Sequence, residues 1–216
     1  GLDEIFRNEM SAKQTESIRR QYELPEKFFL YVGQIYPAKN FGRILRAYAR
    51  VGPKLGIHLV VAGSPSYLYK KELSLIESLG LESWVKQVGW IEHDELPAFY
   101  SLAEALLLPS LYEACPSPPI EAMATGCPVL TADRYGTKEI AGEAALFVNP
   151  EDIGSIADGM SRIVSDNELR SELIDAGYER AKHFQWRDCA RQTLYVLERV
   201  AAGEDIRILE GTKQRI

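Results

Sequence analysis

Two glutamates separated by prolines form the most informative chemical pattern in the sequence. The segment LYEACPSPPIEAMATGCPV runs from Leu111 to Val129 and carries Glu113 and Glu121 eight positions apart. Prolines remove backbone N–H groups and fix φ, so the residues between the acids predict a stiff loop that leads into a helix. A carboxylate accepts two hydroxyl hydrogen bonds at once, and hydrogen bonds to charged groups are the stronger kind. Two acids held in this way suit a ligand with two separate diols.

Each glutamate can also be weighed as a structural residue. Pro118 and Pro119 suit the first positions of a helix over 119–125, which places Glu121 in its first turn. A carboxylate there gains roughly 0.3–1 kcal/mol from the helix dipole, and that alone could account for Glu121. Glu113 follows a strand on a stiff loop and has no such structural reason. A polar ligand explains Glu113 better.

A second candidate segment is GQIYPAKN at 33–40, where Gly33 ends a strand and Lys39 and Asn40 open the next helix. A helix N-terminus offers N–H donors and a partial positive charge that suit phosphate, and Lys39 adds a full charge. The alternative is a turn glycine and a solvated surface lysine. The segment is neither G-x-G-x-x-G nor a Walker A pattern, so ordinary dinucleotide-binding and P-loop folds lose support.

A third loop, GSPSYLYKK at 63–71, also follows a predicted strand and precedes a helix. Gly63 and Ser64 could form a second cradle, but such a loop occurs in every fold of this class. The signal is therefore weak when it is taken alone.

Metal ligands and paired cysteines are scarce in the sequence. The three cysteines have no C-x-x-C spacing, and their odd number fits a reducing compartment: Cys115, Cys127 and Cys189. The three histidines are scattered, and no two aspartates form D-x-D: His58, His93 and His183. We expect no metal site, no disulfide framework and a cytoplasmic location.

Composition narrows the classes of partner. The chain has 216 residues, a hydrophobic share of 46% and a formal net charge of −6 without a basic run. These values predict a globular domain with a full core and argue against nucleic acid as a partner. The apolar runs are too short to cross a bilayer, so no transmembrane segment is expected.

Short apolar runs alternate with stretches of helical periodicity. The runs read as strands buried on both faces, at 28–33, 58–63, 85–89, 105–109, 128–132 and 145–148. The predicted helices between them are 40–51, 67–79, 94–102 with Asp94 as its N-cap, 119–125 and 136–141. This alternation predicts a right-handed, doubly wound, Rossmann-like parallel sheet of the α/β class. Ligands bind such sheets beyond the carboxyl ends of the strands.

The ends of the chain differ from this core pattern. Three helical stretches after Pro150 are expected to cover one side of the sheet, at 151–166, 167–184 and 186–200. Residues 1–27 include a polar amphipathic stretch and are expected to lead in from a preceding domain. Residues 28–200 form the predicted Rossmann-like domain, and 201–216 form a tail with weak periodicity.

The glutamate motif resembles the E-x7-E motif of retaining glycosyltransferases of the GT-B fold, family 4 (group 1). EAMATGCPV matches the family pattern E-A-M-A-x-G-x-P-V, and YVGQIYPAKN resembles the phosphate-binding loop of the family. The similarity runs from about residue 28 to residue 198. It implies an enzyme with two Rossmann-like domains, of which this chain would be the C-terminal, donor-binding one. The N-terminal, acceptor-binding domain would be missing here. The enzyme would contact a membrane through that missing domain.

The resemblance implies a role for each candidate residue. Glu121 would bind the ribose hydroxyls of a nucleotide diphosphate sugar, Glu113 the hydroxyls of the donor sugar, and Lys39 the diphosphate. Glu113 and Lys39 are the catalytic candidates. The other expected donor-binding residues are Gly33, Gln34, Asn40, Gly63, Ala114, Cys115, Pro116, Ser117 and Pro118. No metal or other cofactor is implied, because the nucleotide sugar is a substrate.

The sequence departs from the family pattern at three positions. Gln34 and Ala38 stand where many members carry basic residues, so diphosphate binding depends more on Lys39. Pro116 replaces the usual glycine inside the motif, which puts the sugar contacts of this loop in doubt. We expect transfer of a hexose to a sugar, lipid or polysaccharide acceptor, with GDP-mannose slightly favoured over a UDP-sugar. The alternatives are a sugar-nucleotide epimerase or hydrolase, and a non-enzymatic sugar-nucleotide-binding module.

Overall fold

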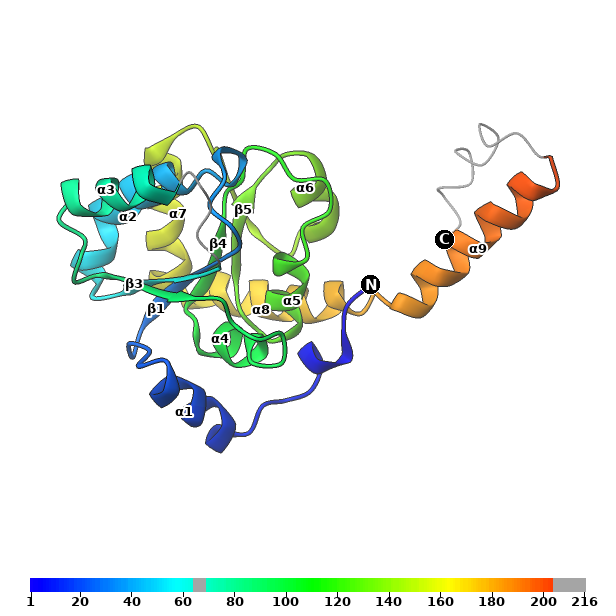
Figure 1. Cartoon of the computed structure of the whole chain (residues 1–216), viewed down its shortest axis with the longest axis horizontal. Coiled ribbons are helices and arrows are strands. Elements are labelled where there is room, and N and C mark those ends of the chain that lie inside the picture. Colours follow the sequence, from blue (N-terminus) through cyan, green and yellow to red (C-terminus); the bar gives the residue numbers. More distant parts are fainter. Residues whose placement is uncertain (64–68, 204–216) are drawn as a thin grey trace.

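The fold is built on a parallel sheet of six strands in the order β3-β2-β1-β4-β5-β6 (Figure 1). The computed structural model describes residues 1–63 and 69–203. The strands are β1 Phe28–Val32, β2 His58–Ala62, β3 Val85–Gly89, β4 Ala105–Leu108, β5 Val129–Ala132 and β6 Leu146–Val148. Each neighbouring pair runs parallel, so the predicted doubly wound Rossmann-like α/β sheet is confirmed.

The central strands are apolar throughout because helices cover both faces of the sheet. In β1, Phe29 and Tyr31 point into one core cluster, whereas Phe28 and Leu30 point into the other. All four side chains are fully buried. This alternation follows from the two-residue period of a strand, and it explains why a continuous apolar run can be a strand.

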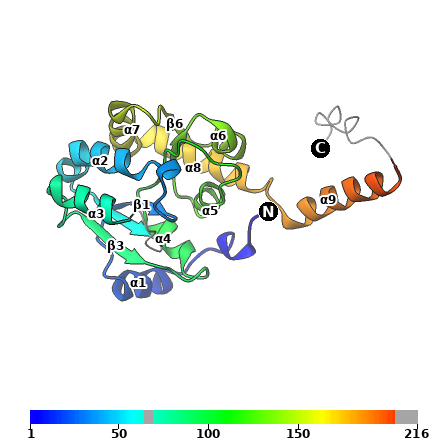
Figure 2. The same cartoon turned by 45° about the horizontal axis from the view of Figure 1, so that its top comes forward.

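Helices cover both faces of the sheet. One face carries α2 Phe41–Leu55, α3 Tyr69–Ser78 and α7 Ile153–Ser165. The other carries α4 Leu96–Leu102, α5 Pro118–Ala124 and α6 Tyr135–Ala141. Figure 2 shows α2 and α7 on one side of the strands and α4 on the opposite side. The helix α8 Asn167–Ala181 packs against both α5 and α7.

The first residues of the chain lie against the domain. A short 3-10 helix, η1 Glu4–Phe6, buries Phe6, and α1 Ala12–Gln21 packs against α4. Ser11 and Gln14 form a capping box that starts α1. The backbone N–H of Leu2 donates to the carbonyl of Phe184 at 2.8 Å. The beginning of the described chain therefore lies beside the end of α8.

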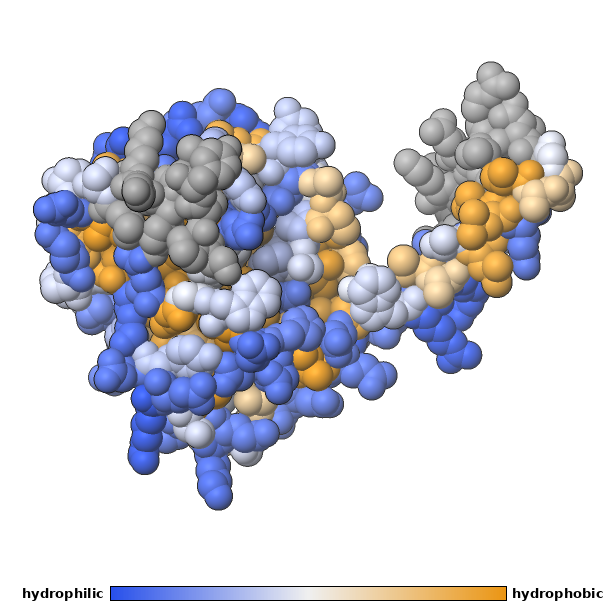
Figure 3. Space-filling model, in the orientation of Figure 1, coloured by the Kyte–Doolittle hydropathy of each residue, from blue (hydrophilic) through white to orange (hydrophobic). Residues whose placement is uncertain are grey.

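The helix α9 Trp186–Ala201 projects away from the sheet (Figure 1). It has no buried residue, and Figure 3 shows apolar surface along it. The prediction that three C-terminal helices cover one side of the sheet is therefore wrong for α9, and α8 contacts α5 of the other face. The tail 204–216 and residues 64–68 lie outside the described residues.

Element boundaries differ from the sequence prediction by a few residues, and one predicted cap is wrong. Asp94 does not cap α4, because the N-cap position is Glu95 and no side chain accepts a hydrogen bond there. Pro97, near the start of the helix, has no backbone N–H for a capping oxygen to bind. The helix α2 runs beyond the predicted residue 51 to Leu55, and its C-cap Gly56 adopts φ 68°.

Candidate functional site

The candidate site lies at the carboxyl ends of β1 and β4, two neighbouring strands from which the chain winds in opposite directions. This is the switch point of a doubly wound sheet, where a crevice forms between the loops. The loop after β1 carries Lys39, and the loop after β4 carries Glu113. The backbone N–H of Leu111 donates to the carbonyl of Ala38 at 2.7 Å and joins the two loops directly.

Lys39 and Glu113 form an ion pair across this crevice. The Lys39 Nζ lies 2.6 Å from the Glu113 Oε1, and the hydroxyl of Ser110 donates to the same oxygen at 2.8 Å. The side chains of Lys39 and Glu113 are 22% and 12% exposed, respectively. Within the described chain, the second carboxylate oxygen of Glu113 accepts no hydrogen bond. Two predicted site residues that lie 74 positions apart therefore meet, and Glu113 keeps acceptor capacity.

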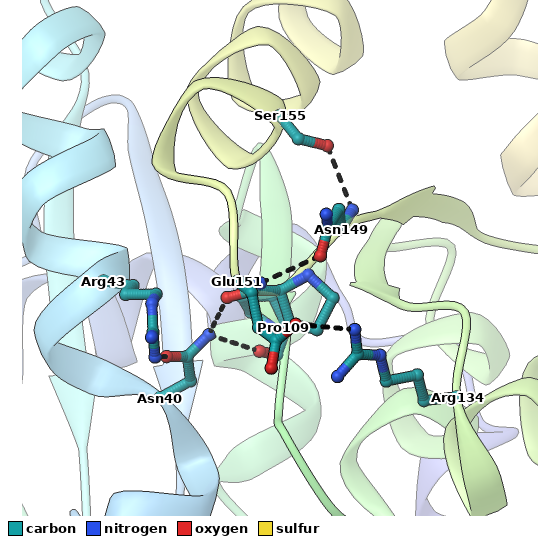
Figure 4. A network of polar contacts seen from close by, with 8 residues as sticks. Asn40, Arg43, Pro109, Arg134, Asn149, Glu151 and Ser155 are labelled. Atoms are coloured by element: carbon teal, nitrogen blue, oxygen red, sulfur yellow. Dashed lines mark hydrogen bonds and ion pairs between the residues drawn. The ribbon is translucent and has the colours of Figure 1, made fainter.

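Asn40 holds the loops of the site together (Figure 4). It adopts φ 62° and is buried, and its Nδ2 donates to the carbonyls of Pro109 at 2.9 Å and Pro150 at 2.7 Å. The Arg43 guanidinium donates to its Oδ1 at 3.0 Å. The start of α2 is thus tied to the ends of β4 and β6. Both side-chain amide hydrogens of Asn40 thus donate to backbone carbonyls of the protein. A direct contact of Asn40 with a ligand stays a prediction.

We expect Asn40→Asp to lower the free energy of unfolding by about 2–4 kcal/mol, because two buried carbonyls would then face a carboxylate. Aspartate keeps the shape of the side chain and tolerates positive φ, so the loss reports the two hydrogen bonds. Urea denaturation followed by circular dichroism measures it. The control is Asn149→Asp, because the exposed Asn149 Oδ1 accepts from the N–H of Glu151 and aspartate retains that acceptor. Equal stability of the two variants would contradict this role of Asn40.

Glu121 is a buried carboxylate in the first turn of α5, as the two prolines at the start of that helix predict. The Tyr100 hydroxyl donates to its Oε2 at 2.8 Å. Burial raises the pKa of Glu121, whereas hydrogen bonds from Tyr100 and Ser117 and the nearby charge of His93 lower it. The helix dipole contributes roughly 0.3–1 kcal/mol, which is small beside the several kcal/mol that burying a charge costs. Support of the helix alone does not explain this acid.

A cavity of about 310 Å³ opens beside Glu121. Six of the residues predicted from the sequence line it: Gly33, Gln34, Gly63, Ser117, Pro118 and Glu121. The opposite wall, which was not predicted from the sequence, is formed by Trp90, Ile91, His93 and Leu96. These four follow β3, so the segment GWIEH after a predicted strand was the signal available. Lys39 and Glu113 lie outside this lining, and the predicted residues thus fall into two adjoining groups.

Gly63 is required where it stands. A Cβ atom there would lie 2.3 Å from the carbonyl oxygen of Gly33, and its φ is 142°. The two loops after β1 and β2 can approach only because this residue has no side chain. Their close approach forms one wall of the cavity.

The loop between the two glutamates is largely exposed. Ala114, Cys115 and Ser117 are exposed, whereas Pro116 is buried. Within the described residues, the backbone N–H groups of Ala114 and Cys115 donate no hydrogen bond. They are available to an anionic or hydroxylated ligand beside Glu113. Their contact with a donor stays a prediction.

No helix among the described residues is long and apolar enough to cross a membrane. Residues 1–63 and 69–203 contain no group of three or more histidine, cysteine, aspartate or glutamate side chains that could hold a metal ion.

The fold and the crevice define a Rossmann-like α/β domain with a candidate ligand site at its switch point. The chain belongs to the family of glycosyl transferases group 1, whose profile matches residues 14–180. The O-antigen chain mannosyltransferase B of Escherichia coli is 28% identical over 180 residues, which cover 82% of this chain and 47% of the relative. The chain thus spans about half the length of that protein.

Solved structures have the same fold. Sucrose-phosphate synthase from Thermosynechococcus elongatus superposes with a TM-score of 0.81 and 26% identity, covering 94% of this chain and 52% of that one. Anabaena HepE in complex with UDP superposes with a TM-score of 0.80 and 21% identity, covering 92% of this chain and 56% of that one. The resemblance to group 1 glycosyltransferases of the GT-B fold, inferred from the glutamate motif, is confirmed.

Proposed function

We propose that this chain is the donor-binding domain of a retaining glycosyltransferase that takes a hexose from a nucleotide diphosphate sugar. The observation that carries the proposal is the Lys39–Glu113 pair, which adjoins a cavity with the buried carboxylate of Glu121. The relative from Escherichia coli is named a mannosyltransferase, which favours GDP-mannose over a UDP-sugar. The same name refers to an O-antigen chain, which favours a glycan as the acceptor.

In this proposal three parts of the site bind three parts of the donor. The nucleoside enters the cavity, where the base lies against the wall formed by Trp90 and Ile91 and the ribose hydroxyls donate to Glu121. The diphosphate binds Lys39 and displaces Glu113 from it. Glu113 then accepts hydroxyls of the donor sugar. As the bond to the sugar breaks, negative charge grows on the leaving diphosphate, and Lys39 and nearby backbone N–H groups stabilise that charge.

The remaining parts of the proposal concern the whole enzyme. A second domain would hold the acceptor, because the chain spans about half of the proteins it matches. It follows that residues 1–216 alone would bind a donor weakly and transfer nothing. Retention of configuration is carried over from the family resemblance. The odd cysteine count favours a cytoplasmic location.

Isothermal titration calorimetry of residues 1–216 with GDP, UDP and GDP-mannose tests this function. We expect binding of at least one nucleoside diphosphate and of GDP-mannose, with equal affinity in the presence and absence of EDTA, because Lys39 supplies the positive charge. A large loss of affinity on chelation would refute metal-independent binding. Absence of binding to all three ligands, or glycosyl transfer by the chain alone in product mass spectrometry, would contradict the proposal of a donor-binding domain.

Tyr100→Phe is expected to make nucleotide binding more sensitive to acid. Burial raises the pKa of Glu121, and three groups from different elements partly offset this rise: Tyr100 on α4, Ser117 before α5 and His93 after β3. Only the ionised carboxylate accepts both ribose hydroxyls, so affinity falls as the pH drops through this pKa. Without the Tyr100 hydroxyl the pKa of Glu121 rises further, and the acid loss of affinity moves to higher pH.

The control for this variant is Tyr22→Phe, which removes a hydroxyl that donates to Glu95 outside the cavity. Calorimetry across the acid range, with GDP as ligand, compares the two variants with the unmodified chain. Tyr22→Phe should leave the pH profile unchanged. Superimposed profiles for all three proteins would show that the Tyr100 hydroxyl does not tune Glu121.

A further inference from the structure

Exposed aromatic side chains gather on the loops at the carboxyl edge of the sheet. Among the described residues before α9, the large apolar side chains with high exposure include Tyr36, Trp90, Tyr112 and Tyr135. Each follows a different strand, namely β1, β3, β4 and β5. Trp90 belongs to the cavity already described. Tyr112 and Tyr135 do not line it, and they lie against each other.

Tyr112 and Tyr135 form a pair that the fold does not use for its core. Their ring centroids are 5.3 Å apart, with an angle of 59° between the planes. The residues are 58% and 65% exposed, respectively. A pair this exposed gains little from burial, so packing within the described chain does not account for it.

The backbone of Tyr135 is strained, and the exposed ring gains little packing energy to offset that strain. Tyr135 adopts φ 47°, a left-handed conformation that is rare and strained for a bulky residue. Strain of this kind gathers at functional sites, where the surrounding structure holds it in place. A glycine would relieve it, yet the chain presents an aromatic ring to solvent here.

The pair is joined directly to the loop of Glu113. Tyr112 is the residue before Glu113, and Gly136 follows Tyr135. The backbone N–H of Gly136 donates to the carbonyl of Glu113 at 3.1 Å. A Cβ atom on Gly136 would lie 2.2 Å from the carbonyl oxygen of Ala114, so the two loops are in close contact. The segments that carry the two rings are therefore in direct backbone contact at Glu113.

We propose that Tyr112 and Tyr135 form a stacking platform for a pyranose ring of the acceptor glycan, an inference that rests on the proposed function. A pyranose presents an apolar C–H face and polar edges, and tyrosine offers a flat apolar ring with a polar tip. The donor sugar belongs to the shielded Glu113, whereas the two rings face solvent, from which a second sugar must approach. One ring of the acceptor that the second domain holds would thus also stack on this chain beside the donor.

Saturation-transfer NMR with an α-linked mannotriose as the probe tests the platform on the unmodified chain. Tyr135→Gly removes one ring and relaxes the positive φ, so this variant should keep or gain stability. Tyr112→Ser removes the other ring. We expect each variant to weaken mannotriose binding by about three- to tenfold, as the loss of one aromatic contact implies.

Controls separate this site from the donor site and from a loss of folding. Tyr178→Ser removes an exposed tyrosine on α8 and should bind mannotriose as the unmodified chain does. All three variants should bind GDP with unchanged affinity. Mannotriose binding that depends on the two rings, in a chain that binds no nucleotide, would support the platform while the donor proposal fails.

Three results would overturn the platform. The first is no saturation transfer to mannotriose at millimolar concentration, and the second is equal binding by all variants. The third is a concentration-dependent dimer in analytical ultracentrifugation that Tyr135→Gly dissociates, because the rings would then serve contact between two copies of the chain.

Discussion

Glu121→Gln weakens the binding of bare nucleoside diphosphate and of nucleotide sugar alike, by about 1.5–3 kcal/mol or roughly 10- to 150-fold in affinity. The reason is that the ribose is common to both ligands and Glu121 is the buried carboxylate in the nucleoside cavity. Glutamine keeps the volume of the side chain and still offers one oxygen to the Tyr100 hydroxyl. Alanine would leave that buried hydroxyl without its partner and would destabilise the fold, so a loss of affinity could not be separated from a loss of stability.

The matched control is Glu95→Gln. Glu95 also accepts a tyrosine hydroxyl, that of Tyr22, but it lies outside the cavity. Calorimetry with GDP and with GDP-mannose should show no change for this control. Melting temperatures of both variants should match that of the unmodified chain. If Glu121→Gln binds both ligands as tightly as Glu95→Gln does, Glu121 supports only its helix and the nucleoside cavity is wrongly assigned.

The sheet was predictable because its strands are buried on both faces. Phe28–Val32 and Ala105–Leu108 are apolar throughout and stand between turn residues, so their type and approximate bounds follow from composition alone. Buried parallel strands joined by helices leave few arrangements other than a doubly wound sheet. By contrast, α9 has the same apolar periodicity as α7, and periodicity does not say whether a partner surface is present.

The candidate site was only partly predictable, because residue type and loop position can be read locally but contact cannot. Glu113, Glu121 and Lys39 stand out as charged residues at strand or helix ends. Their division into an ion pair and a separate buried carboxylate depends on β1 and β4 being neighbours in the sheet. Tyr100 was missed because it lies on the apolar face of α4, where a buried tyrosine reads as ordinary core.

The opposite wall of the cavity was missed for a related reason. His93 and Trp90 follow an edge strand, and nothing in their local sequence distinguishes them from other loop residues. They reach Glu121 only because the loops after β1, β2 and β3 converge on the start of α5. Tertiary structure therefore brought four segments to one cavity, whereas the sequence had pointed to three loops taken separately.

We expect Glu113→Ala to weaken the binding of the nucleotide sugar but not that of the bare nucleotide. It should weaken the binding of GDP-mannose by about 1.5–3 kcal/mol, because the hydroxyls of the donor sugar lose a charged acceptor. Bare GDP should keep its affinity within about 0.5 kcal/mol, and any change should be towards tighter binding. In the unmodified chain, the diphosphate must displace Glu113 from Lys39, whereas in the variant Lys39 is already available.

The control is Glu151→Ala. Glu151 is another acid at the same edge of the sheet, and it forms an ion pair with Arg134 at 3.1 Å. The control should leave both affinities unchanged, because Glu151 is not assigned to the donor. Calorimetry of the two variants with the two ligands gives four comparisons. If Glu113→Ala weakens GDP as much as GDP-mannose, Glu113 acts on the nucleotide by holding Lys39 in place. The ion pair would then be part of the diphosphate site itself, and the assignment of Glu113 to the donor sugar would be wrong.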